Sequence, residues 1–441
     1  MTILNESGIP DVLPPLHAVG NLAQRLRDVL VVVAGTQAEA HLIQCLPAAP
    51  SPNLPPSRHD QRVTFAILDP SDPPPQGLLA SRIVESAAET RGTELVLLVA
   101  GHPAEALGVD ATFEARLAAR KLDLPVEVID PEAPHEIPGI LSTDLEDGVT
   151  AALVNLCPRR RTSDLVQTAS PAKRGGLLGG LLGRGREEPD DGRPVVLLGG
   201  ALSPGAAQGL AAELSRAAVE VAGAVPGDEV AALPPLGEGT VVAVMDPNLT
   251  TAASVAERRG ATVVRTLMPI GVDGTARFVQ DVAAEAGSRT SEVVRARSAW
   301  ENLGALRNRI RGKRVFFAGD TGFEVPLARF LADAGAVVLE VGAPRLDRRF
   351  LSAELQALGP DVDVVVSPDY RGQLNRIDEA RPDVVVCSPG LHLPLVARGH
   401  LCRSPQDFLR AGLYGYGGAR RILELLARTL RRAETLDSLN L

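Results

Sequence analysis

The chain has 441 residues, 45% of them hydrophobic and 22% charged, which is the composition of a globular protein too long for one hydrophobic core. Its formal net charge of -9 disfavours nucleic acid as a partner, because binding to a phosphate backbone depends on clustered Lys and Arg. No apolar run reaches the roughly 20 residues of a membrane helix and the N-terminus lacks the regions of a signal peptide, so we expect a cytoplasmic protein of two or three domains.

Short β-branched runs alternate with helical patterns along the chain, which is typical of parallel βαβ units. The first group of predicted strands covers 29–34, 63–68, 95–99 and 126–129. The second group covers 195–198, 219–223, 241–245 and 262–265. The third group covers 314–318, 337–341, 362–366 and 384–387. We expect three Rossmann-like, doubly wound parallel sheets around a central cleft, with ligands at the carboxyl ends of the strands.

A segment rich in Gly, Arg and acidic residues separates the first two groups and predicts a flexible linker or insertion at 159–193. Its leucine pairs, in GGLLGGLLGR, leave a short amphipathic anchor or docking segment as an alternative. A helical pattern at 291–311 then leads into the third group and places Trp300 in the core. The sequence predicts three domains: an N-terminal α/β domain at 1–158, a second α/β domain at 194–295, and a third α/β domain with a C-terminal helix at 296–441.

Several motifs of the second and third groups form a recognisable series. They are the strand-turn-helix unit GKRVFFAGDTGFEVPLARFLADAG, the strand exit DVVVCSPGLHLPLVARGH, the segment FLRAGLYGYGGARRILELLAR, and a proline followed by Gly-x-x-Gly-Thr in LMPIGVDGTARF. Together these motifs resemble the nitrogenase component 1 superfamily, and within it most closely the N subunits of light-independent (dark-operative) protochlorophyllide reductases.

The resemblance implies a [4Fe–4S] cluster held by cysteines of the first domain, but the ligands are absent here. The cysteine position in VLVVVAGTQAEAHLIQC holds Glu39, and the one in ELVLLVAGHPAEALGVD holds His102. The remaining position falls in LPPLHAVG, which contains Pro14 and His17 and no thiol. Thiolates stabilise iron–sulfide bonding, so we expect the cluster to be lost, and no cofactor is firmly predicted.

An alternative for these positions is a zinc or iron ion bound by Glu39, His102 and His17, since two imidazoles and a carboxylate form a familiar site. The simpler interpretation is that the three polar side chains fill the space of the missing cluster. Cys45 lies more than a turn beyond Glu39 on the predicted helix, which disfavours it as a ligand. The four cysteines show neither C-x-x-C nor zinc-like spacing, and buried, reduced thiols are expected.

The third group supplies the predicted substrate-binding residues. The resemblance places the wall of a tetrapyrrole cavity in the strand exit, which gives Gly390, His392 and Pro394. Tyr414 and Tyr416 could border the same cleft, because an aromatic edge and a hydroxyl suit a planar tetrapyrrole. A surface-loop role for His392 and a packing role for Tyr414 remain as alternatives. The turn AGDTGF opens a helix, where its amides could meet an anion, but a structural turn is favoured because the P-loop spacing is absent. No catalytic residue is predicted.

The resemblance implies a nitrogenase-like oxidoreductase component of bacteriochlorophyll biosynthesis that reduces ring D of protochlorophyllide. Its expected partners are a homologous B-type subunit, in a heterotetramer, and an ATP-dependent iron–sulfur reductase that supplies electrons. A rival interpretation is a cluster-free scaffold, carrier or regulatory subunit that binds a tetrapyrrole or metallocofactor without reducing it. The missing cysteines favour the rival, and the third-domain motifs favour the reductase.

Overall fold

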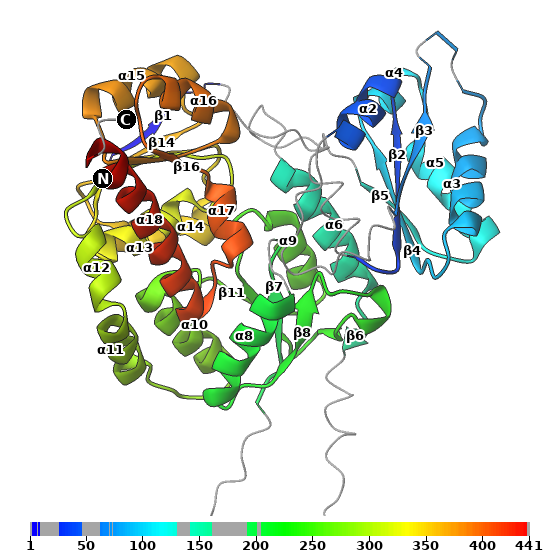
Figure 1. Cartoon of the computed structure of the whole chain (residues 1–441). Coiled ribbons are helices and arrows are strands. Elements are labelled where there is room, and N and C mark those ends of the chain that lie inside the picture. Colours follow the sequence, from blue (N-terminus) through cyan, green and yellow to red (C-terminus); the bar gives the residue numbers. More distant parts are fainter. Residues whose placement is uncertain are drawn as a thin grey trace, which may run out of the picture.

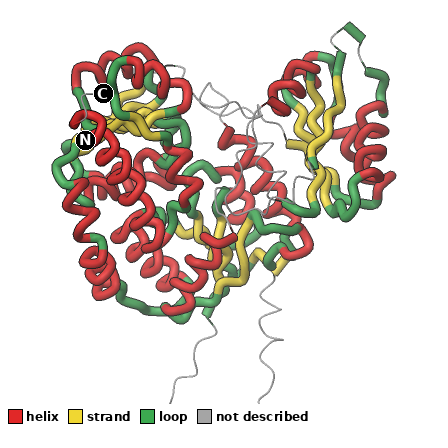
Figure 2. Tube along the Cα trace, viewed as in Figure 1, coloured by secondary structure: helices red, strands yellow, loops and turns green. Residues whose placement is uncertain are grey.

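The computed structural model describes residues 2–6, 8, 26–45, 62–69, 71–72, 74–129, 142–160, 192–200 and 204–438. Within these ranges the chain forms three parallel sheets of four to six strands, flanked by helices, and a two-stranded parallel sheet. Figures 1 and 2 show this arrangement. The predicted α/β fold with Rossmann-like units is thereby confirmed, while the central cleft stays a prediction. No helix in the described part of the chain is both long and apolar enough to cross a bilayer.

The first sheet has the strand order β3-β2-β4-β5. Its strands are β2 (Val29–Gly35), β3 (Val63–Ile67), β4 (Leu95–Ala100) and β5 (Val126–Ile129). Its helices are α2 (Gln37–Cys45), α3 (Leu78–Glu89), α4 (His102–Ala106) and α5 (Ala111–Leu122). Strands β2 and β4 are buried at every residue, which explains their unbroken Val and Leu runs. One sheet face packs against α3 and α5, and the other joins a core shared with the second sheet.

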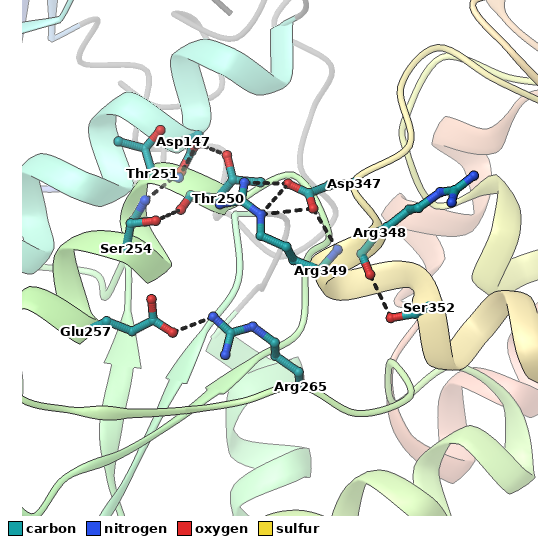
Figure 3. A network of polar contacts seen from close by, with 11 residues as sticks. Asp147, Thr250, Thr251, Ser254, Glu257, Arg265, Asp347, Arg348, Arg349 and Ser352 are labelled. Atoms are coloured by element: carbon teal, nitrogen blue, oxygen red, sulfur yellow. Dashed lines mark hydrogen bonds and ion pairs between the residues drawn. The ribbon is translucent and has the colours of Figure 1, made fainter. Parts of the chain in front are cut away.

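Helix α6 (Ser142–Leu156) connects the first sheet to the second unit. It packs against α9 (Thr250–Arg258), and its Asp147 accepts hydrogen bonds from the amides of Thr251 and Ala252 at 2.8 and 2.9 Å. Figure 3 shows this carboxylate at the start of α9. A carboxylate there satisfies amides that the helix itself leaves unpaired. Helix α6 also packs against β5 of the first sheet, so it lies between the two units, and the boundary predicted at residue 158 stays a prediction.

The second sheet has the order β11-β10-β7-β8. Its strands are β7 (Val195–Leu198), β8 (Val221–Val225), β10 (Val241–Val244) and β11 (Thr262–Val264). The remaining elements of this unit are α8 (Pro204–Arg216), the 3₁₀ turn η1 (Val230–Ala232) and α10 (Gly271–Glu285). Strands β7 and β10 are buried throughout, like the central strands of the first sheet.

The predicted linker begins with structure rather than with free chain. Arg159 and Arg160 form strand β6, which pairs in parallel with β9 (Leu236–Gly237). The guanidinium of Arg259 also donates to the carbonyl of Asn155 at 2.9 Å, just before this strand. Tertiary pairing holds these two residues, so the predicted start of the linker at 159 is too early. Residues 161–191, including the leucine pairs, lie outside the described part of the chain.

The third sheet has the order β1-β14-β13-β12-β15-β16. Its strands are β12 (Arg314–Ala318), β13 (Val337–Ala343), β14 (Asp363–Val366), β15 (Val384–Cys387), β16 (Cys402–Arg403) and β1 (Ile3–Asn5). Its helices are α13 (Glu324–Asp333), α14 (Arg348–Leu358), α15 (Tyr370–Ala380), α16 (Pro389–Ala397), α17 (Pro405–Ala411) and α18 (Gly415–Ser438).

Strand β1 joins the N-terminus of the chain to this last sheet, where it pairs with β14. Glu6 extends the connection, because its carboxylate accepts from the guanidinium of Arg376 at 2.6 Å and from the amide of Asp369 at 2.7 Å. The predicted first domain starts at residue 1, whereas these contacts place residues 3–6 with the third unit. Three residues with one polar member carry too little periodicity for a sequence pattern to reveal the strand.

The helical pattern at 291–311 forms two helices, α11 (Val293–Asn302) and α12 (Gly304–Ile310), which meet at Leu303. Trp300 packs against the shared core and stacks on Phe330 with ring centroids 6.0 Å apart. Its indole nitrogen donates to Asp273 at 3.1 Å. Trp300 therefore has the packing role that the sequence predicts.

Candidate functional site

Glu39 lies in the first turn of α2 and closes the start of that helix. Its carboxylate accepts from the amide of Thr36 at 2.7 Å and from the hydroxyl of Thr36 at 3.0 Å, and its own amide donates to that hydroxyl at 3.3 Å. This reciprocal pair is a capping box. The position at which the resemblance expects a cluster thiolate therefore holds a helix cap in this chain.

The other predicted first-domain positions are described only in part. His102 is the first residue of α4, directly after β4, but its side chain lies outside the described part of the structure, as do Pro14 and His17. A metal site formed by Glu39, His102 and His17 stays a prediction. A thiolate-held [4Fe–4S] cluster does not fit these positions, because the described donor, Glu39, is a carboxylate already engaged by Thr36.

The turn AGDTGF repeats the arrangement of the first domain. Glu324 begins α13, and its carboxylate accepts from the amide and the hydroxyl of Thr321, both at 2.8 Å. The side chain of Glu324 is completely buried, and this burial raises its pKa. Because the carboxylate already occupies the Thr321 amide, the contacts favour a structural turn over an anion site.

Three predicted substrate residues lie on α16 rather than in a loop. The helix starts because Ser388 caps it, accepting from the amide of Leu391 at 3.4 Å, and because proline suits its first position. Gly390 is exposed in the first turn, while His392 and Pro394 are half-buried. These residues come together on one helix, and their role toward a substrate stays a prediction.

Tyr414 lies away from α16, in the core that the second and third units share. Its ring meets Phe323 edge to face with centroids 6.4 Å apart, and its backbone bridges Ile270 of the second unit. The residues of α16 instead pack with the cluster on the other face of the third sheet. The structure therefore brings Tyr414 together with the AGDTGF turn and not with His392.

The structure gives His392 two neighbours that sequence reasoning missed, Cys387 and Cys402. The ligand atoms of the three side chains all lie within 4.8 Å of one another. The thiol of Cys387 is fully buried, and its hydrogen bond to Cys402 lowers the pKa of the Cys402 thiol. Local spacing could not reveal this group, because it depends on the pairing of β15 with β16. The one available signal was a cysteine that ends a predicted strand, with a histidine just beyond it.

Comparisons with known proteins agree on the class of this fold. The family model described as "Nitrogenase component 1 type Oxidoreductase" matches residues 79–431. A solved structure of nitrogenase Cp1 at pH 6.5 superposes with a TM-score of 0.68 over 97% of this chain and 93% of its own, at 12% sequence identity. At that identity the likeness shows the fold alone.

Curated relatives match nearly the full length of the chain. A protein of Roseiflexus sp. (strain RS-1) is 33% identical over 99% of this chain and 96% of its own length. One of Heliobacterium modesticaldum (strain ATCC 51547 / Ice1) is 30% identical over 98% of this chain and 97% of its own. Both are named light-independent protochlorophyllide reductase subunit N.

Proposed function

Because the chain belongs to the nitrogenase component 1 family, we propose that it is an N-type subunit of a reductase complex acting on protochlorophyllide or a closely similar tetrapyrrole. The observation that carries the proposal is the match to relatives named subunit N across 99% of the chain. The fold of three parallel sheets is consistent with it. We place the protein in the cytoplasm as part of the same proposal.

The name "subunit N" supports an assembly of several subunits. We propose a homologous B-type subunit as the direct partner, in a heterotetramer, and an ATP-dependent iron–sulfur reductase as the electron donor. The residues proposed to contact the tetrapyrrole are Gly390, His392, Pro394 and Tyr414. Substituting Tyr414 and a residue of α16 separately would show which face of the third sheet the pigment meets.

A second candidate function is a cluster-free carrier or regulatory subunit that binds a tetrapyrrole without reducing it. The observation that favours it is the Thr36–Glu39 capping box, which occupies the position where the resemblance implies a cluster ligand. A carboxylate used as a helix cap offers no thiolate for iron–sulfide bonding. A carrier of this kind would have the same fold and the same pigment site as the reductase subunit, but it would not take part in electron transfer.

Reconstitution separates the two functions. The chain is co-expressed with a B-type subunit, purified without oxygen, mixed with the iron–sulfur reductase, ATP and protochlorophyllide, and tested for chlorophyllide by absorption. Product formation that depends on this chain supports the reductase subunit. Pigment binding at one site per chain without product supports the carrier. A chain that neither associates with the B-type subunit nor binds pigment contradicts both.

Iron and acid-labile sulfide are measured on the same preparations, and on the chain purified alone. We expect no stoichiometric [4Fe–4S] cluster on the isolated chain, because the matched positions do not fit one. About four irons and four sulfides per chain would contradict this expectation.

A further inference from the structure

Strand pairing places two cysteines on one face of the third sheet. Strands β15 and β16 are parallel neighbours, and Val385 is the partner of Cys402 in their register. Paired residues of parallel strands point to the same face, and so does the residue two positions further along a strand. Cys387 is that residue. The burial agrees, because Val385, Cys387 and Cys402 all belong to the cluster on the α15–α16 face.

Helix α16 brings the third group over the same face. The helix follows β15 directly, and Leu391 and Leu395 anchor it in the cluster that contains Cys387. His392 lies beside Leu391 in the first turn, where its amide donates to the carbonyl of Ser388 at 3.1 Å. The side chain of His392 is half-buried, and this placement brings its ring close to both cysteines. A ring nitrogen of His392 and the two thiol sulfurs lie within 4.8 Å of one another.

The separations suit a metal ion. Around a tetrahedral zinc ion, with Zn–S near ~2.3 Å and Zn–N near ~2.0 Å, neighbouring ligand atoms lie about 3.5–3.8 Å apart. A contraction of at most about 1.3 Å therefore brings the three atoms to bonding geometry. Cys387 is fully buried, whereas Cys402 and His392 are half-buried, so an ion has an approach from the side of these two residues.

Outer contacts hold the strand that carries Cys402. The Cys402 sulfur lies 3.6 Å from the carbonyl of His400. The ring of His400 hydrogen-bonds to Asp378 of α15 at 2.7 Å, and Arg398 pairs with the same carboxylate at 2.6 Å. Contacts of this kind orient ligands and support metal affinity.

We propose that Cys387, His392 and Cys402 form a binding site for a thiophilic divalent cation, Zn²⁺, with the fourth coordination position open to solvent. Two thiolates and one imidazole select zinc over magnesium or calcium, which prefer oxygen ligands. Two thiolates are also too few for a [4Fe–4S] cluster, which is normally held by four. The site lies on the opposite sheet face from the core that joins the units. It shares His392 with the proposed tetrapyrrole contacts, so metal binding is tested without pigment and its outcome is separate from that of the proposed function.

The test is metal binding by the full chain. Protein stripped with a chelator is titrated with Zn²⁺ alone, and with Co²⁺ to follow thiolate-to-cobalt charge-transfer absorption. We expect one Zn²⁺ per chain, with a Kd below about 1 µM. Cys402→Ser and His392→Ala should each weaken binding by more than about 100-fold, beyond the 10–100-fold effect typical of outer-shell partners.

Two control variants outside the site should keep full binding: Cys157→Ala, at a buried cysteine, and His41→Ala, at an exposed histidine. Because Cys387 is buried and its substitution could impair folding, the decision rests on Cys402→Ser and His392→Ala, with circular dichroism confirming that both fold. Wild-type chain without stoichiometric Zn²⁺ overturns the proposal. Full Zn²⁺ binding by both Cys402→Ser and His392→Ala also overturns it. Loss of Zn²⁺ from the Glu39→Ala and His102→Ala double variant in that case would place the metal at the first-domain positions instead.

Discussion

Arg329 of α13 and Glu354 of α14 form an ion pair at 2.5 Å that is almost completely enclosed, with 1% and 0% of the side chains exposed. Each partner also bonds the loop of the second unit that precedes α10. Arg329 donates to the carbonyl of Ile270 at 2.7 Å, and Glu354 accepts from the amide of Met268 at 2.6 Å. The pair therefore fastens the third unit to the second.

Glu354→Gln should lower the free energy of unfolding by about 3–5 kcal/mol, because the buried Arg329 charge then keeps only the partly exposed Asp333, 3.1 Å away, as an ion-pair partner. Urea denaturation followed by circular dichroism measures the loss. The double variant Arg329→Met with Glu354→Leu should lose less than the sum of the two single variants, since both charges of the enclosed pair are then removed together.

The matched control is Arg349→Ala, which removes an exposed pairing with Asp347 (Figure 3). Its cost should stay below about 1 kcal/mol, as is usual for exposed ion pairs. Equal losses in Glu354→Gln and in this control would contradict the role of the enclosed pair.

Asp147→Ala should destabilise the chain, because the amides of Thr251 and Ala252 at the start of α9 would lose their acceptor. The expected loss is about 1–2 kcal/mol, as for other helix caps. Asp147→Asn should lose less, since its side chain keeps an acceptor oxygen and burial already raises the pKa of Asp147 toward the neutral form. Thermal unfolding of the three proteins ranks them, and an Asn variant as unstable as the Ala variant would contradict the prediction.

Burial raises the pKa of Asp333 from its ordinary 3.8 to about 6, against the pull of the Arg329 guanidinium. The folded chain then keeps this proton to a higher pH than the unfolded chain does. This difference contributes to the free energy of unfolding. The contribution is fully present below about pH 4, is lost as the pH rises through about 6, and amounts to at most about 3 kcal/mol.

The check compares wild type with Asp333→Asn, which stays neutral at every pH. Urea midpoints between pH 4 and pH 7 should show the variant gaining stability relative to wild type as the pH rises. A constant difference across this range would mean that Asp333 does not titrate there.

The two thiols Cys157 and Cys402 should react at different rates in the folded chain. Cys157 is 3% exposed, and burial raises its pKa to about 11, so little thiolate is present at neutral pH. Cys402 is only half-buried. Iodoacetamide applied to chelator-treated protein, followed by peptide mass spectrometry, should label Cys402 first, with the difference disappearing in urea. Faster labelling of Cys157 in the folded chain would contradict the burial pattern.

The sequence predicted the bounds of four strands most accurately, whether or not the strand is fully buried. Predictions for β5, β7, β12 and β15 coincide with the observed bounds, because each is a short apolar run ended by a turn signal. Strand β6, with the letters RR, and strand β16, with CR, were missed. Strands of two residues form only because they pair with an adjacent strand, so no periodic pattern in the local sequence indicates them.

The candidate site residues also fall into those that local sequence could predict and those that depend on tertiary pairing. The absence of thiols at Glu39 and His102 could be seen in the sequence, but the capping role of Glu39 depends on the exact placement of Thr36. The convergence of Cys387 and Cys402 depends on β16, a strand that the sequence did not predict. Site residues that depend on local spacing could therefore be predicted from the sequence, whereas site residues that meet through sheet pairing could not.

Glu39→Cys offers a direct test of what this position does in the folded chain. If Glu39 is a helix cap, the new thiol loses two hydrogen bonds from Thr36, and stability should fall by roughly 1 kcal/mol. Glu39→Gln keeps an acceptor for the Thr36 amide and should retain most of that stability. Iron content after anaerobic purification should be the same in both variants and in wild type, because one thiolate cannot hold a cluster that normally needs four protein ligands. Iron and sulfide that appear only in Glu39→Cys would contradict this expectation, and would show that the remaining ligands of the implied cluster are already in place nearby.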